Sequence, residues 1–183
     1  AYAKIEEYVA AMERSQASHE ALTGVVLEGG TPDDIAQLLA AQLAGTVTLL
    51  DRTGEVLVRR DSASSPCPAP SEQDLAGTVE DARRSGRRAT SVDTAGVAHS
   101  VASIRAGDNY LGALAWSRVP AAERGVADDM DLRTLERATH ILGLLILKER
   151  AVAEASERLS GELLTELMVG GPGISPTQRA RAR

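Results

Sequence analysis

Residues 135–168 carry a helical apolar repeat that is longer than one small globular domain needs. Apolar side chains recur three, four or seven positions apart, which places them on one side of an α-helix. The repeat comprises Leu135, Leu142, Leu145, Ile146, Val152, Leu159, Leu163 and Leu167. A periodic pattern much longer than ~25 residues without internal caps is typical of a coiled coil, a transmembrane helix or a helix that connects two domains.

The transmembrane alternative fails on length. The continuous apolar run ILGLLIL, residues 141–147, has seven residues, whereas a bilayer span needs ~20. The N-terminus shows no apolar leader with basic flanks. Cys67 is the only cysteine, so one chain can form neither a disulfide framework nor a multi-cysteine zinc site. We therefore expect a cytoplasmic protein with no membrane contact.

The second half of the repeat favours pairing with another helix. Ala138, Leu145, Val152 and Leu159 are spaced by sevens, as a left-handed coiled coil requires. The complementary positions include Glu149 and Ser156, which weaken the seam. The pattern predicts a homodimer with an adjustable interface, and the residues expected at the dimer and connector helix are Leu145, Val152, Leu159 and Leu163.

Composition bounds the class of protein. The 183 residues fit one main domain, and 43% hydrophobic with 25% charged residues is ordinary for a folded chain. There is no Phe and only one Trp, so Leu, Val, Ile and Ala must pack the core. A net charge of −6 argues against nucleic-acid binding by this chain itself, because phosphate attraction requires a basic face.

The remaining patterns predict an α+β fold with an antiparallel sheet of about five strands. Helices are expected over 3–28, with a break near 15–18, over 31–45, over 72–85 and from Asp131 onward; strands over 46–51, 55–60, 87–95 and on both sides of the AGDN turn at 106–109. Thr31 is the expected N-cap of the second helix and Gly45 its stop. Strands joined by tight turns and bracketed by helices favour antiparallel pairing over βαβ units.

Three segments resemble a known family. They are HEALTGVVLEGGTPDDIAQLLAAQLAGTVTLLDRTGEVLVRR, HSVASIRAGDNYLGALAWSR and LRTLERATHILGLLILKERAVAEASERLSGELLTELMVGG. In their order, and above all in the final helix, they resemble the N-terminal GAF-like sensor domain of PucR/CdaR-type bacterial transcriptional regulators, over roughly residues 18–170. The resemblance implies a GAF-like antiparallel sheet with flanking N-terminal helices and a long C-terminal helix. It also implies DNA binding only through domains that are not in this chain.

The domain organisation that follows has four parts. Residues 1–30 are expected to form an N-terminal helix that takes part in dimerisation, and residues 31–147 the GAF-like sensor domain. Residues 148–170 are then a helical connector, and residues 171–183 a linker or the start of a following domain. The helix would carry the state of the sensor to the missing domains.

The expected function is a sensor that binds a small-molecule effector and transmits its state through a dimeric helix. One alternative is a GAF-like dimerisation module that has lost ligand binding, and a weaker one places the sensor before a kinase or cyclase. No G-x-G-x-x-G or G-x-S-x-G motif is present, and the three histidines stand singly, so we expect no enzymatic activity, no cofactor and no metal site.

Within the sheet, five residues are candidates for a ligand pocket: His99, Val101, Tyr110, Leu114 and Trp116. For His99 and Trp116 the alternative is ordinary core packing. The arginine cluster from Arg83 to Arg88 could hold an anionic effector, since arginine binds carboxylates and phosphates with two parallel hydrogen bonds, or it could be a solvated helix end. Cys67 has no basic neighbour in sequence, so we expect a passive thiol.

Overall fold

The computed structural model describes residues 2–63, 67–68, 70, 72–120 and 129–169. The chain divides into two compact units, Ala1–Ile146 and Leu147–Arg183, and each is described by itself. In chain order the elements are α1 (Tyr2–Leu27), α2 (Pro32–Leu43), β1 (Thr46–Asp51), β2 (Val56–Asp61), α3 (Glu72–Ser85), β3 (Arg88–Val92), β4 (Ala98–Ala106), β5 (Asn109–Arg118) and α4 (Asp129–Val169). The predicted linker at residues 171–183 lies outside the described residues.

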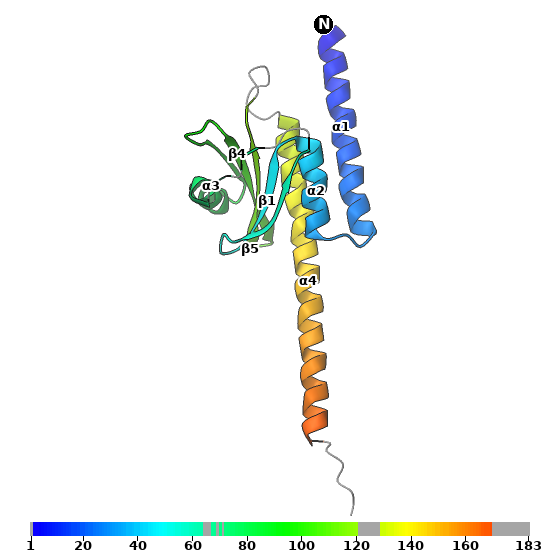
Figure 1. Cartoon of the computed structure of the whole chain (residues 1–183). Helices are drawn as coiled ribbons and strands as arrows, with labels where there is room; N and C mark the ends of the chain where they lie inside the picture. Colours follow the sequence, from blue (N-terminus) through cyan, green and yellow to red (C-terminus); the bar gives the residue numbers. More distant parts are fainter. Residues whose placement is uncertain (1, 64–66, 69, 71, 121–128, 170–183) are drawn as a thin grey trace, which may run out of the picture. The chain divides into compact units, whose positions relative to one another are not determined.

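The first unit is built on one five-stranded sheet in the order β2-β1-β5-β4-β3. Every neighbouring pair is antiparallel, and β5 lies at the centre (Figure 1). The predicted α+β class and the strand number are thus confirmed. The chain leaves the sheet at one edge, after β2, and re-enters at the other edge with β3. Helix α3 makes this crossing.

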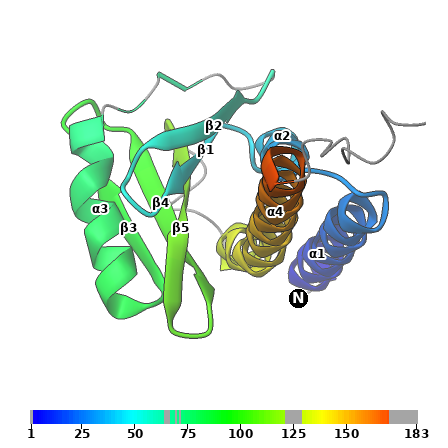
Figure 2. The same ribbon diagram turned by 90° about the horizontal axis from the view of Figure 1, so that it is seen from below.

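Helices cover both faces of the sheet. Seen along the strands, α3 lies against one face, while α1, α2 and the part of α4 up to Ile146 lie on the other (Figure 2). The α3 side encloses a small core of Leu50, Leu75, Ala82, Val101, Ala113 and Ala115. The opposite side encloses a larger core, which includes Leu22, Leu39, Leu49, Ile104, Leu114, Trp116, Leu135 and Leu142. Strand residues alternate between these two cores.

Helix α2 begins and ends as its sequence predicts, within one or two residues. The Thr31 hydroxyl accepts from the backbone N–H of Asp34, and the Asp34 carboxylate accepts from the backbone N–H of Thr31, so both halves of a capping box are present. The helix ends at Leu43. The Trp116 indole N–H donates to the carbonyl of Ala44 at 3.2 Å, which joins the helix end to β5.

Helix α4 begins at Asp129, so Asp131 lies inside it and the predicted N-cap at Asp131 is wrong. Leu145 is 3% exposed and belongs to the larger core of the first unit. It is therefore removed from the predicted dimer seam, because its side chain already packs within its own domain. Val152 and Leu159 are 62% and 61% exposed. The side chain of Leu163 lies outside those that the structure describes.

Helix α1 runs unbroken from Tyr2 to Leu27, so the break expected near residues 15–18 is absent. Its C-terminal half packs on the domain through buried Leu22, and the Ser18 hydroxyl donates to the Gln42 side chain of α2 at 2.6 Å. Its N-terminal half leaves three apolar side chains exposed on one helical face: Ile5, Val9 and Met12. No helix within the described ranges combines the length and apolarity needed to cross a bilayer.

A buried polar network joins β3, β4 and β5 at one end of the sheet. His99 Nε2 lies 3.2 Å from Asp93 Oδ2, and His99 Nδ1 lies 2.8 Å from Ser117 Oγ. Because an ionised carboxylate can only accept, Nε2 donates to Asp93. Asp93 Oδ1 also accepts from the backbone N–H groups of Ala95 and Val97. These bonds, above all the one from Val97, hold the pKa of Asp93 below its usual value.

The chain is closely packed around Gly45, just before β1, and a substitution at this position tests that packing. The φ of Gly45 is +137°, and an added Cβ would lie 2.5 Å from the carbonyl oxygen of Ser117. Gly45→Ala should lower the free energy of unfolding by about 2–4 kcal/mol in urea denaturation, from backbone strain and overpacking. Gly24→Ala is the control, since a Cβ there meets no atom within 4 Å. It should raise stability by about 0.5–1 kcal/mol. Equal stability of the two variants would contradict this packing.

The Asp93 network predicts a pH dependence. The folded-state pKa of Asp93 is lowered, so the carboxylate contributes stability above the unfolded-state pKa of about 4, and this contribution is lost as the pH falls through the folded value. Asp93→Asn should therefore be less stable than the wild type at pH 7, and the difference should shrink below about pH 4. Urea midpoints between pH 3 and pH 7 measure this. A constant difference would assign the effect to geometry alone.

Candidate functional site

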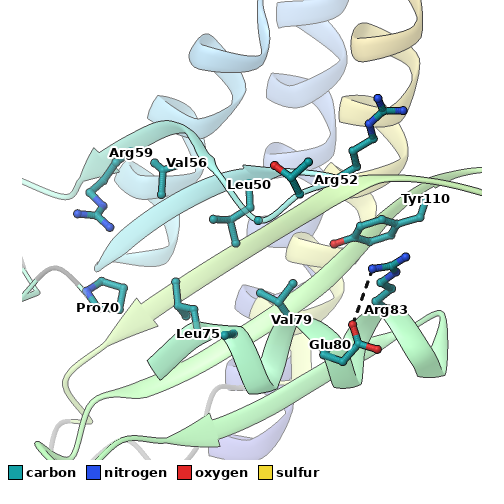
Figure 3. Close-up of a pocket in the computed structure, with 13 residues that line it drawn as sticks. Leu50, Arg52, Val56, Arg59, Pro70, Leu75, Val79, Glu80, Arg83 and Tyr110 are labelled. Atoms are coloured by element: carbon teal, nitrogen blue, oxygen red, sulfur yellow. Dashed lines mark ion pairs between the residues drawn. The ribbon is translucent and has the colours of Figure 1, made fainter. Parts of the chain in front are cut away.

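A pocket of about 310 Å³ lies between α3 and strands β1, β2 and β5 (Figure 3). It is lined by Leu50, Arg52, Thr53, Gly54, Val56, Arg59, Pro70, Leu75, Ala76, Val79, Glu80, Arg83 and Tyr110. Its volume is at the lower end of the ~300–1,000 Å³ that small-molecule sites occupy. All of its residues belong to the first unit. The site is therefore formed within one domain.

An irregularity in β2 shapes one wall of the pocket. Leu49 pairs with Val58, but Leu50 pairs with Val56, so Leu57 is an extra residue in the strand. In a regular strand Val56 and Arg59, three positions apart, would face opposite sides. The bulge at Leu57 brings both onto the α3 side, where they line the pocket.

Tyr110 and Arg83 form the other end of the pocket. The Arg83 guanidinium carbon lies 5.1 Å from the centre of the Tyr110 ring, and Figure 3 shows it beneath that ring. Burial raises the pKa of Tyr110, and the positive charge of Arg83 offsets only part of this effect. The Tyr110 hydroxyl therefore stays protonated at neutral pH and can donate a hydrogen bond.

Two polar atoms of the lining are buried and have no hydrogen-bond partner among the residues that the structure describes. They are Nε of Arg59 and the hydroxyl of Tyr110. Leaving a buried donor unpaired costs about 1–3 kcal/mol, and most buried polar groups in folded proteins are paired. These two atoms are therefore the strongest chemical feature of the pocket.

Of the five pocket residues predicted from the sequence, Tyr110 alone lines this pocket. Val101 and His99 share the α3 side of the sheet with it, but Val101 lies in the small core and His99 in the polar network. Leu114 and Trp116 face the opposite side and belong to the larger core. The structure therefore does not bring the five together. Ile104 pairs with Gly112 but Arg105 pairs with Tyr110, so Leu111 is an extra residue in β5, and this irregularity turns Tyr110 to the side opposite to Leu114 and Trp116.

The Asp93–His99–Ser117 network has the residue types of a hydrolytic triad, but it is buried. Ser117 is 0% exposed, so its hydroxyl is closed to a substrate. The network instead ties β3, β4 and β5 together. Cys67 is also buried, and burial with the nearby charges of Asp93 and Asp61 raises the pKa of its thiol. The thiol therefore has little thiolate character at neutral pH.

The arginine cluster from Arg83 to Arg88 is divided by the fold. Only Arg83 lines the pocket. Arg84 forms exposed ion pairs with Glu80 and Asp81, and Arg88 forms ion pairs with Asp129 and Glu136 of α4. The cluster as a whole is therefore not a single anion site in this structure.

Sequence reasoning missed Arg59, Leu50 and Val79, which line the pocket with Tyr110. Strict alternation along β2 would have placed Arg59 on the side opposite to Val56, so the sequence carries no signal for the pairing that the bulge creates. Leu50 and Val79 read as ordinary core positions. Within the described ranges, no three His, Cys, Asp or Glu side chains come close enough together to hold a metal ion.

Neither a protein-family model nor a curated protein matches the chain in sequence. In structure it is similar to a GAF domain assigned to a sensor histidine kinase of Pseudomonas syringae pv. tomato, with 14% identity, a TM-score of 0.52, and coverage of 86% of this chain and 97% of that one. A chain of the E. coli DhaR(N)–DhaL complex has 17% identity, a TM-score of 0.45, and coverage of 91% and 57%.

A phycocyanobilin-bound GAF domain from a cyanobacterial phytochrome has 15% identity, a TM-score of 0.46, and coverage of 73% and 94%. At such low identities a structural likeness concerns the fold alone, and the first of these three similarities carries the assignment. The five-stranded antiparallel sheet, its flanking helices and the long C-terminal helix agree with it. The chain has a GAF-like fold.

Proposed function

We propose that this chain is the sensory module of a bacterial transcriptional regulator. It binds a small-molecule effector in the pocket beneath α3, and it transmits the bound state through α4 to DNA-binding domains that are not in this chain. It has no enzymatic activity of its own and works in the cytoplasm as a homodimer. The GAF-like fold that it shares with a domain assigned to a sensor histidine kinase supports a sensory role.

One observation carries the proposal: α4 is a single helix from Asp129 to Val169, and its side chains between Leu132 and Leu145 contribute to the larger core of the first unit. Leu135 and Leu142 pack against the sheet, while Val152 and Leu159 further along the same helix are exposed. A helix is stiff over this length and rises ~1.5 Å per residue. A change in how its first turns sit on the sheet is therefore carried along its axis.

A physical route leads from the pocket to α4. Tyr110 lines the pocket and pairs across the β4–β5 hairpin with Arg105. The carbonyl oxygen of Arg105 would lie 3.1 Å from a Cβ placed on Gly143, so the helix and the hairpin are in close contact there. An effector that moves Tyr110 shifts the hairpin, and the hairpin in turn presses on α4.

Exposed apolar side chains on two helices support dimerisation with a second copy of the chain. Ile5, Val9 and Met12 lie four and three positions apart on α1, and they share one face of that helix. Val152 and Leu159 lie seven apart on α4 and are exposed as well. A helix face of this kind is stabilised when a second apolar helix covers it.

The dimer prediction is tested with a double variant. Val152→Glu with Leu159→Glu should raise the dissociation constant of the dimer at least about tenfold, because a carboxylate buried without a partner costs more than ~1.4 kcal/mol. Ala153→Glu with Ser160→Glu adds the same two charges at exposed positions, each one residue further along the helix, and should have little effect. Sedimentation equilibrium of the 183-residue chain measures both. A wild type that stays monomeric at high micromolar concentration refutes the dimer.

Effector binding is tested by a thermal-shift screen of purines, aromatic acids, amino acids and nucleotides. At 100 times its dissociation constant, a ligand adds about 2.7 kcal/mol and raises the melting temperature by several degrees. Val79→Trp, which fills the pocket from α3, should abolish this shift. Val92→Trp makes the same change at an exposed position of β3 and should preserve it. If no compound stabilises the wild type, the dimerisation module without ligand binding is the better account.

A further inference from the structure

The unpaired buried donors of the pocket define what a ligand must supply. Nε of Arg59 donates only, and the hydroxyl of Tyr110 both donates and accepts. Both atoms are buried, both lack a partner, and both belong to residues that line the same pocket. A ligand with oxygen acceptors at both places would satisfy them. Two such atoms in one cavity are a stronger signal than either alone.

The charges of the lining favour a negatively charged ligand. Three arginines and one glutamate line the pocket of a chain whose overall net charge is −6. Arg59 makes no ion pair with any residue that the structure describes. The Arg83–Glu80 pair is long, at 3.9 Å, and Glu80 also pairs with Arg84 at 3.7 Å. Exposed pairs of this kind contribute little, so Arg83 is available to a ligand.

The positive groups lie at opposite ends of an apolar middle. In Figure 3, Arg59 and Pro70 are at one end of the row of lining residues, and Tyr110 and Arg83 are at the other. The side chains between the two ends are Leu50, Val56, Leu75 and Val79. A ligand that fits this order has a hydrocarbon body with an acceptor group at each end.

We propose that the pocket binds a small dicarboxylate with an apolar spacer, one carboxylate on Arg59 and the other on Tyr110 and Arg83. Arginine holds a carboxylate through two parallel N–H···O bonds, which are stronger than bonds between neutral groups. The Tyr110 hydroxyl donates a further hydrogen bond to the carboxylate that Arg83 holds. This assignment rests on the effector site proposed above and names the chemical class of its ligand.

The first experiment is isothermal titration calorimetry of the whole chain with named probes. They are succinate, adipate and terephthalate as dicarboxylates, butyrate, hexanoate and benzoate as the corresponding monoacids, and inorganic phosphate. At least one dicarboxylate should bind, and its matched monoacid should bind at least about tenfold more weakly, since it loses the charged contacts at one end. A monoacid or phosphate that binds as tightly overturns the proposal.

The second experiment compares variants of charged residues inside and outside the pocket. Arg59→Gln should weaken binding of the dicarboxylate at least about tenfold, and Tyr110→Phe should weaken it about threefold to tenfold. Glu80→Gln removes the competing carboxylate and should strengthen binding. Arg84→Gln, next to Arg83 but outside the lining, should leave affinity within about twofold. Circular dichroism and the melting temperature confirm that each variant is folded.

The outcomes separate the ligand class from the proposed function. If no dicarboxylate binds at millimolar concentration, the ligand class is refuted. If a neutral or cationic compound binds instead, and Val79→Trp abolishes its binding, the sensory function stands without this ligand class. If a dicarboxylate binds with the expected sensitivity to Arg59 and Tyr110, but hydrogen exchange in α4 does not change, the ligand class stands and transmission through α4 fails.

Discussion

The central strand β5 is the constraint on which the rest of the structure depends. Its residues from Leu111 to Ser117 are all buried, so both of its faces must be covered. Leu114 and Trp116 require the layer of α1, α2 and α4, while Ala113 and Ala115 require α3. The small alanine side chains let α3 approach the sheet, and the pocket lies where Tyr110 and the bulged part of β2 face α3.

The proposed transmission from the pocket to α4 passes from one face of this strand to the other. The pocket and the part of α4 up to Ile146 lie on opposite sides of the sheet, so a ligand in the pocket does not contact that part of the helix directly. The β4–β5 hairpin contacts both, through Tyr110 on one side and the carbonyl of Arg105 against Gly143 on the other. Helix packing against a close-packed core is responsive to small displacements, because interiors have few voids to absorb them.

The sequence predicted the elements well where local chemistry defines them. The Thr31 N-cap, the turn before β5 and the helix over 72–85 are short-range features, and the structure has them at the expected residues. It predicted the pocket poorly. Leu114 and Trp116 looked like lining residues because they are large and lie in a strand, yet strand alternation cannot tell which of two covered faces holds a cavity.

The sequence by itself determined the class of fold and the length of α4, because helical and strand periodicities and their caps are local properties of the chain. Only the tertiary structure decided that Leu145 belongs to the domain core and that Arg59 lines the same pocket as Tyr110. The reason is physical: Arg59 reaches the pocket through a bulge at Leu57, and that bulge exists only in the register between β1 and β2. This register is set by contacts between strands, so the sequence pattern of β2 alone does not predict it.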